Sequence, residues 1–402
     1  MAKIIKLTRK YWRRLKKHPW AKWVLLGAGG AAILAVAAVV LLGGRSEVTG
    51  FGENTTTISL VAGGDLNVTD NTVASGKTGS GYDYTRPFLD VAEIFAGADG
   101  ALLNFEGNFY GEPYGSATVS APLAMAQTLK AMGVDFLQVA NSCTVKNGML
   151  GLKQTLNSIR QTGMEPLGAY ESNSDAARQQ GFVLRDIGGV RVALVAFTKG
   201  MDGMGLPAGS EKCVNLLYTD YTSTYQKIDT EGISRVLEAV EKAKPDNTIA
   251  LLHWGSEGNN SISPSQKKIV KQMLSLGVDA IIGTHSHQVQ SVVYDEENHT
   301  LVAYSLGDFY GSGEKNGTYY SVLLNLQVTK DNLTGETKIT SCSHTPIYLL
   351  TPERDGEPLR LMRMEAAIES YEGNHVDKIT EIAYNNMLYA LKRANSRVET
   401  GK

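Results

Sequence analysis

Residues 277–287 read GVDAIIGTHSH, an apolar run that ends in two histidines spaced two residues apart. Ala280–Ile282 predicts a short buried strand that ends at Gly283. In an extended stretch, residues i and i+2 lie on the same face, so we expect His285 and His287 to point the same way. Imidazole is the commonest metal ligand among side chains, and this pair is the strongest single indication of a metal site in the chain.

Polar side chains also follow other short apolar runs that predict strands. These runs are Ile58–Ala62, Gly100–Asn104, Asp135–Ala140 and Thr248–Leu252. The candidate ligands at or just past their ends are Asp65, Asn104, Glu106, Asn141 and His253. Because open α/β sheets bind ligands at the carboxyl ends of their strands, we expect these residues to converge with the two histidines. Carboxylate and imidazole together suit divalent Mn, Fe or Zn, and a pair of such ions can activate a water molecule.

The segments between these strands have helical spacing. They are Pro87–Ala96, Ala121–Met132, Leu150–Gln161, Thr230–Ala243 and a stretch from Ser263 to about Leu276. In the last of these, Ser263 and Gln266 have the spacing of a capping box around Pro264. Alternating strands and helices predict an α/β layered domain. Residues 319–328 and 336–348 predict an antiparallel pair, residues 350–375 are expected to be irregular, and 376–394 predict a terminal helix.

The amino terminus differs sharply in charge from the rest of the chain. Residues 1–23 hold nine Lys or Arg and no acid; removing these nine from the 39 basic residues leaves 30 against 41 acidic ones. An acidic body argues against nucleic acid as a partner, because phosphate binding needs clustered cations. The 19 uncharged residues Val24–Leu42 are long enough to cross a bilayer.

This pattern predicts a single-pass protein of the cell membrane. We expect a cytoplasmic basic tail over 1–23, a transmembrane anchor over 24–44 and a stalk over 45–56, with the main domain extracytoplasmic. The alternative is a cleaved signal peptide, since Ala35-Val36-Ala37 is similar to a cleavage site. The apolar run continues past that site, which favours an uncleaved anchor.

Several motifs of residues 57–350 occur in an order that resembles a known family. They are Gly64-Asp65, Asn104-Phe105-Glu106-Gly107, His253-Trp254-Gly255-Ser256-Glu257, Gly283-Thr284-His285-Ser286-His287 and Tyr304-Ser305-Leu306-Gly307-Asp308-Phe309. The set resembles the CapA family of poly-γ-glutamate capsule synthesis proteins, which is similar to the calcineurin-like metallophosphatases. The resemblance implies a four-layer α/β fold, a two-sheet sandwich flanked by helices. Beyond it, residues 351–402 are expected to form a C-terminal irregular segment and helix.

The resemblance also implies a site and a role. It gives Asp65, Glu106, His253, His285 and His287 as metal ligands with Asn104 as a further candidate, and we take Asp65, His253 and His285 as the candidate catalytic residues. It implies a part in the synthesis of capsule or another envelope polymer. The implied partners are the lipid bilayer, membrane polymer-synthesis subunits and an anionic polymer.

One motif of the family is lost from this chain. Where the family has Asn, His and Asp after Asn141, this sequence has Ser142, Cys143 and Lys146. Serine is a poor metal ligand, a thiol cannot replace an imidazolium acid, and a lysine opposes cation binding nearby. These changes favour an accessory or weakly active metal-binding subunit. An active metal-dependent hydrolase of phosphoester or amide bonds, and a metal-free structural ectodomain, are the alternatives.

Overall fold

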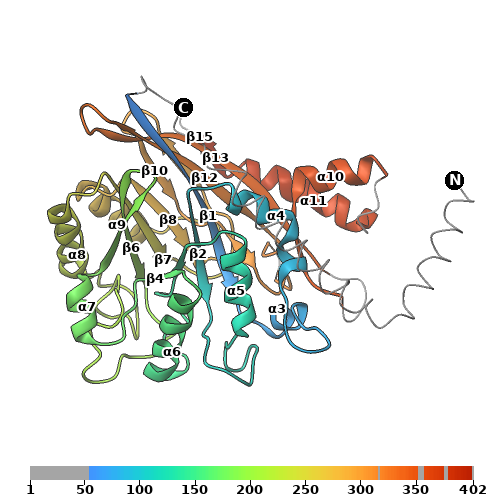
Figure 1. The fold of residues 1–402 in the computed structure, drawn as a ribbon, viewed down its shortest axis with the longest axis horizontal. Helices are drawn as coiled ribbons and strands as arrows, with labels where there is room; N and C mark the ends of the chain where they lie inside the picture. Colours follow the sequence, from blue (N-terminus) through green and yellow to red (C-terminus); the bar gives the residue numbers. More distant parts are fainter. Residues whose placement is uncertain (1–53, 316, 352–356, 375–378, 401–402) are drawn as a thin grey trace, which may run out of the picture. The chain divides into compact units, whose positions relative to one another are not determined.

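Two mixed β-sheets form the fold (Figure 1). In spatial order, the first contains β14 (Arg360–Arg363), β13 (Thr337–Leu350), β12 (Tyr320–Asp331), β1 (Thr55–Asn67), β2 (Gly100–Glu106), β3 (Phe136–Gln138) and β4 (Glu165–Leu167), and β11 (Asp308–Tyr310) also pairs with β1. The second contains β15 (Val398–Thr400), β9 (Val292–Asp295), β10 (Thr300–Ala303), β8 (Ala280–Thr284), β7 (Asn247–His253), β6 (Val190–Thr198) and β5 (Phe182–Ile187).

The computed structural model describes residues 54–315, 317–351, 357–374 and 379–400. The expected basic tail, the anchor and residues 45–53 of the expected stalk lie outside the described residues. Strand β1 begins at Thr55, so the last two residues of that stalk belong to the first sheet. No helix within the described ranges is long and apolar enough to cross a membrane.

The helices of the described residues are α3 (Asp70–Ser75), α4 (Thr85–Ala96), α5 (Leu123–Ala131), α6 (Gly148–Gln161), α7 (Asn173–Gln179), α8 (Thr230–Ala243), α9 (Pro264–Ser275), α10 (Met364–Glu372) and α11 (Glu381–Asn395). The last two, α10 and α11, contribute buried side chains to the core between the sheets. Buried side chains of α4, α5 and α6 pack on the outer face of the first sheet, and those of α8 and α9 pack on the outer face of the second. The layers therefore follow the order helix, sheet, sheet, helix, as the family resemblance implies.

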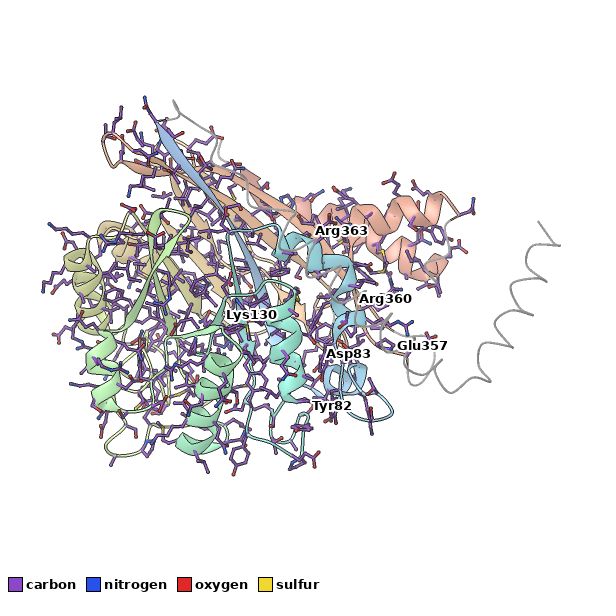
Figure 2. All side chains as sticks on the ribbon, viewed as in Figure 1. Tyr82, Asp83, Lys130, Glu357, Arg360 and Arg363 are labelled. Carbon is purple, nitrogen blue, oxygen red and sulfur yellow. The ribbon has the colours of Figure 1, made fainter. Side chains whose placement is uncertain are left out.

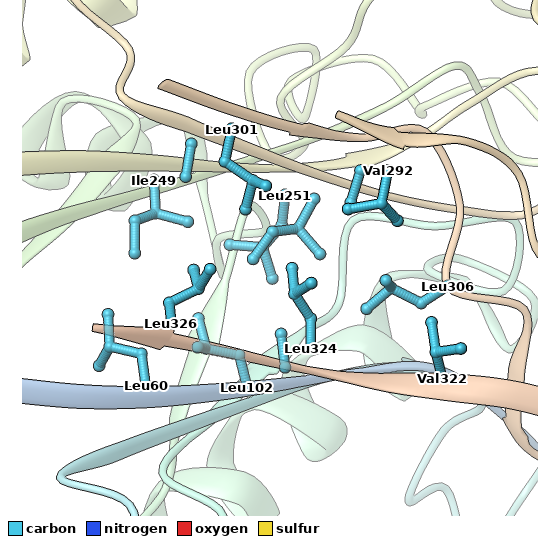
Figure 3. Close-up of a cluster of buried hydrophobic side chains, with 14 of the residues drawn as sticks. Leu60, Leu102, Ile249, Leu251, Val292, Leu301, Leu306, Val322, Leu324 and Leu326 are labelled. Carbon is cyan, nitrogen blue, oxygen red and sulfur yellow. The ribbon is translucent and has the colours of Figure 1, made fainter. Parts of the chain in front are cut away.

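The core between the sheets follows from the alternation of side chains along each strand. Leu60 of β1 faces the second sheet, whereas its neighbour Val61 packs with the helices on the outer face. Figure 3 shows Leu60, Leu102 and Leu324 of the first sheet opposite Ile249 and Leu251 of the second. Burial of such side chains on both faces of the central strands stabilises the sandwich.

Most of the predicted elements are confirmed. Helix α8 has the predicted bounds, and α9 begins with the predicted capping box, in which the Ser263 side chain accepts from the backbone N–H of Gln266. Strands β12 and β13 form the predicted antiparallel pair. Cys143, Cys213 and Cys342 all lie within the described residues, and none of them forms a disulfide.

The prediction that residues 350–375 are irregular is wrong. They contain β14 and α10, whose buried Met362, Met364 and Ala367 belong to the core between the sheets. The Arg360 side chain, labelled in Figure 2, also forms an ion pair of 3.1 Å with Asp90 of α4. Strand β14 is only four residues long and forms because β13 offers it an edge, which local periodicity does not reveal.

Candidate metal centre

Asp65 lies at the centre of a row of polar residues in the first sheet. Its register partners are Asn104 on the parallel strand β2 and Asp308 on the parallel strand β11. Asp65 is fully buried. The prediction that Asp65, Asn104 and Glu106 lie at or past strand ends is wrong for the first two, because pairing extends β1 to Asn67 and β2 to Glu106, whereas Glu106 is the last residue of β2.

A register shift in β1 directs the Asp65 side chain. The shift lies between Ala62 and Asp65, where Gly64 comes so close to a neighbouring loop that a Cβ atom there would lie 1.8 Å from the carbonyl oxygen of Gly307. The backbone N–H of Asp65 donates to the same oxygen at 3.0 Å. Glycine is therefore required at position 64, and the close approach brings the Asp308 segment beside Asp65.

The second sheet supplies the histidines. His253 is the last residue of β7, while His285 and His287 lie in the loop after β8. His285 has φ +87° and His287 has φ +56°, so the prediction of an extended His-Ser-His stretch is wrong. The backbone N–H of His285 donates to Asp65 Oδ2 at 2.9 Å. A carboxylate of the opposite sheet thus holds the loop in a conformation that non-glycine residues rarely adopt.

These residues form three overlapping groups in which ligand atoms lie within 4.8 Å of one another. The groups are Asp65/Glu106/His253, Asp65/His287/Asp308 and Glu106/His285/His287. Asp65, Glu106 and His287 each belong to two of them. A carboxylate shared in this way has a suitable position to bridge two cations.

Two asparagines support the cluster. The Asn104 amide donates to Asp65 Oδ1 at 2.6 Å, and its nitrogen lies 3.3 Å from His253 Nδ1. The Asn141 amide donates to Asn104 Oδ1 at 3.0 Å and to the Phe105 carbonyl at 2.7 Å. Both amides are buried and satisfied, so they fix the Asp65 carboxylate in one orientation.

Sequence reasoning missed Asp308 as a member of the site. Its Oδ1 lies 2.7 Å from His287 Nδ1, and it is 7% exposed. The sequence offers the same indication for Asp308 as for the other candidates, because Asp308 follows a stretch of apolar and small residues that begins at Leu301. Its place beside Asp65 depends on β11, a strand of three residues that forms only by pairing with β1.

Burial and the neighbouring charges perturb the acids and bases of the cluster. Burial, with a further contribution from Asp308, raises the pKa of Asp65 to about 6. Burial and the nearby Asp65 raise the pKa of Glu106 well above its usual range. Burial opposes the charge on His287, but the hydrogen bond to Asp308 and the surrounding carboxylates outweigh it and raise the pKa of His287 to about 11.

The two deeper histidines show the opposite behaviour. Burial holds the pKa of His253 and of His285 well below the usual range. Both imidazoles are therefore neutral, the state that binds metals. The His285 Nδ1 atom is buried and has no hydrogen-bond partner among the described residues. Three carboxylates, neutral imidazoles and this unpartnered nitrogen fit a divalent transition metal.

The residues that replace the lost family motif contribute differently. Ser142 Oγ lies 3.1 Å from His253 Nε2, at the edge of the cluster. Burial raises the pKa of the Cys143 thiol well above its usual range, so the sulfur is not the thiolate that binds metals. Lys146 is exposed and belongs to none of the three groups.

Known proteins similar to this chain agree with the resemblance drawn from its motifs. The family described as bacterial capsule synthesis protein PGA_cap matches residues 59–312. The capsule biosynthesis protein CapA of Bacillus anthracis is 29% identical over 191 residues, 48% of this chain and 43% of that protein. The PGA biosynthesis protein CapA of Bacillus subtilis (strain 168) is 29% identical over 260 residues, 63% of each chain. The chain thus matches less than two thirds of the length of either relative.

Two solved structures are also similar. The calcineurin-like phosphoesterase YfkN of Bacillus subtilis has a TM-score of 0.42 and 15% identity, over 85% of this chain and 98% of that chain. A phosphatase of Mycoplasma pneumoniae has a TM-score of 0.44 and 13% identity, over 73% of this chain and 94% of that chain. The family match over residues 59–312 covers more than half of this chain. The chain therefore belongs to the bacterial capsule synthesis protein family PGA_cap.

Proposed function

We propose that this protein acts in the biosynthesis of a capsule of poly-γ-glutamate or a related envelope polymer, as an accessory or weakly active subunit that binds a divalent metal. Family membership supports the proposed role in polymer biosynthesis, since the two relatives are named for capsule and PGA biosynthesis. The proposal extends this role to a chain that matches 43% of the length of the Bacillus anthracis protein and 63% of the length of the Bacillus subtilis protein.

The proposal places the main domain outside the cell membrane on a single-pass anchor with a cytoplasmic amino terminus. The basic residues 1–23 and the uncharged run Val24–Leu42 support it. In this location its partners are the bilayer, membrane-bound polymer-synthesis subunits and the anionic polymer itself, and not nucleic acid.

The metal part of the proposal depends mainly on one observation, the membership of Asp65 in two ligand groups. A bound Mn, Fe or Zn ion would polarise a phosphoryl or carbonyl oxygen and lower the pKa of a water ligand. Asp65, Glu106, His253, His285, His287 and Asp308 would hold the metal. Among them, Asp65, His253 and His285 are the proposed catalytic residues, and Asn104 orients Asp65 through its hydrogen bond.

Weak activity follows from the missing proton donor. A general acid contributes about 10²–10⁴-fold to the rate of such a reaction. At the position of the family's histidine this chain has Cys143, whose thiol pKa is raised by burial. Such a thiol releases its proton far less readily than an imidazolium ion.

An active hydrolase is the second candidate, and the completeness of the ligand set favours it. Asp65, Glu106, His253, His285 and His287 all come together although the middle motif is lost. A chain that had abandoned metal chemistry has no need of three buried carboxyl groups around buried imidazoles, an arrangement that destabilises the fold. The same observation disfavours a metal-free ectodomain.

Elemental analysis of the purified full-length chain tests the metal. We expect about one or two equivalents of Mn, Fe or Zn, and their loss from a His285→Ala/His287→Ala double variant. His344→Ala is the control, because His344 binds Asn395 outside the centre. Wild-type protein without metal contradicts the proposal and leaves a structural ectodomain.

Hydrolysis of phosphoester and γ-glutamyl amide substrates by the metal-loaded chain separates the first two candidates. Metal without turnover supports the accessory subunit. Turnover that is lost with the metal establishes the hydrolase. Protease protection of intact cells tests the location, since an extracytoplasmic domain is digested while residues 1–23 are protected.

A further inference from the structure

Lys199 brings a positive charge to the metal centre from a part of the chain that no motif marks. It follows Thr198, the last residue of β6, which is the register partner of His253. Its Nζ atom donates to the carbonyl oxygen of Gly255 at 2.9 Å and lies 3.3 Å from His285 Nε2. The ammonium also lies 4.4 Å from the centre of the Tyr225 ring. These contacts from three loops hold the partly buried side chain in one place.

This cation has no carboxylate partner among the described residues, where no acid lies within 4.0 Å of its Nζ atom. The surrounding acids Asp202 and Glu257 act on it only at longer range. An ammonium group has three N–H donors. The carbonyl of Gly255 accepts from one of them, and His285 Nε2 accepts from a second only while it carries no hydrogen, so at least one donor is left for a ligand.

Lys199 lies beside the more exposed side of the centre. The side chains of Asp65 and His253 are fully buried, whereas those of Glu106 and His287 are 9% and 15% exposed. His285, which Lys199 contacts, shares a ligand group with these two residues. A ligand that reaches the centre from solvent therefore arrives next to the ammonium group.

A further positive charge favours an anionic ligand at this centre. The acidic side chains Asp65, Glu106 and Asp308 offset the positive charge of a bound metal, and the position of the family's missing histidine holds an uncharged thiol. We propose that Lys199 binds an anionic oxygen, of a phosphate or a carboxylate, on the substrate at the metal centre, and so supplies the positive charge that Cys143 does not. This inference rests on the proposed function and deepens it, by naming the residue that selects an anionic substrate.

Calorimetric titration of the metal-loaded full-length chain with inorganic phosphate and with γ-linked triglutamate tests the proposal. We expect Lys199→Ala to weaken binding of the preferred anion by about tenfold or more, because a hydrogen bond to a charged group is lost. Lys199→Arg keeps the charge and most of the affinity. Lys212→Ala is the matched control, since Lys212 lines a separate cavity of about 430 Å³ between α7 and α8. Preference for phosphate or for triglutamate identifies which anionic group the site takes.

Metal content of the same variants separates anion binding from support of His285. Lys199→Ala that retains its metal and loses anion affinity supports the proposal. Loss of metal from Lys199→Ala, unchanged affinity in that variant, or failure of wild-type protein to bind either anion overturns it. If wild-type protein holds no metal, the proposed function fails. The inference is then decided by whether Lys199→Ala weakens the binding of phosphate to the metal-free chain.

Discussion

Asp65 and Asp308 are register partners on neighbouring parallel strands, and both carboxylates face the same nitrogen of His287. Asp308 Oδ1 lies 2.7 Å and Asp65 Oδ2 lies 3.6 Å from His287 Nδ1. These charges keep His287 protonated, with a pKa of about 11, in the metal-free protein. The imidazolium thus occupies a place between carboxylates where a metal would otherwise neutralise them, and metal binding has to displace its proton.

The first prediction concerns this proton. Asp308→Asn removes the charged partner of His287, so the His287 pKa in the metal-free protein should fall from about 11 towards its ordinary value. The measurement is an NMR titration of the histidine ring signals. An unchanged His287 pKa in the variant would show that Asp308 does not stabilise the imidazolium.

The second prediction concerns metal stoichiometry. Asp65 belongs to two ligand groups and Asp308 to one. If wild-type protein holds two equivalents, Asp65→Asn should bring the content below one, whereas Asp308→Asn should leave about one. Elemental analysis measures both, with circular dichroism to confirm folding. Equal losses in the two variants would argue against Asp65 as a ligand that two groups share.

The third prediction restores the lost motif. The double variant Ser142→Asn/Cys143→His places an amide and an imidazole next to His253, which Ser142 contacts at 3.1 Å. If the missing acid limits catalysis, phosphoester hydrolysis should rise by about 10²–10⁴-fold. Cys342→His, on β13, serves as the control. A variant that retains metal without a gain in rate would place the limitation elsewhere.

The fourth prediction concerns Gly64. A Cβ atom at this position would lie 1.8 Å from the Gly307 carbonyl oxygen, which belongs to backbone and cannot rotate away. Gly64→Ala should therefore destabilise the fold by about 2–3 kcal/mol and displace Asp65. Urea denaturation measures the change against Gly79→Ala, where a Cβ atom meets nothing within 4 Å. Similar midpoints for the two variants would contradict the close approach.

The fifth prediction concerns pH and a carboxyl group outside the metal centre. Burial raises the pKa of Asp279 from 3.8 to about 6. Between these values the folded state binds more protons than the unfolded state, so the Asp279 contribution to stability is lost as pH rises from 3.8 to about 6.

An asparagine at position 279 stays neutral and can still accept from the Thr248 N–H, a hydrogen bond of 2.7 Å. Asp279→Asn should therefore be more stable than wild type above this pH range, by up to about 3 kcal/mol. Chemical denaturation across a pH series measures the difference. A constant difference at all pH values would exclude titration of Asp279 as its cause.

The sequence alone determined the alternation of strands and helices in this protein and most of the candidate ligands. Alternation of short apolar runs with helical spacing predicted the layered α/β fold, and local capping chemistry at Ser263 predicted where α9 begins. Residue chemistry at the strand ends identified His253, His285 and His287. These features depend on near neighbours in the chain, so they can be read from it directly.

Tertiary structure alone decided how the two sheets combine these ligands. Asp308 reaches the centre through a three-residue strand that exists only because β1 pairs with it. The conformation of the His285 loop depends on a hydrogen bond to Asp65, 220 residues away in the sequence. Lys199 has its place because β6 and β7 end side by side. Contacts over such distances leave no local pattern, since they arise from the packing of one sheet against the other.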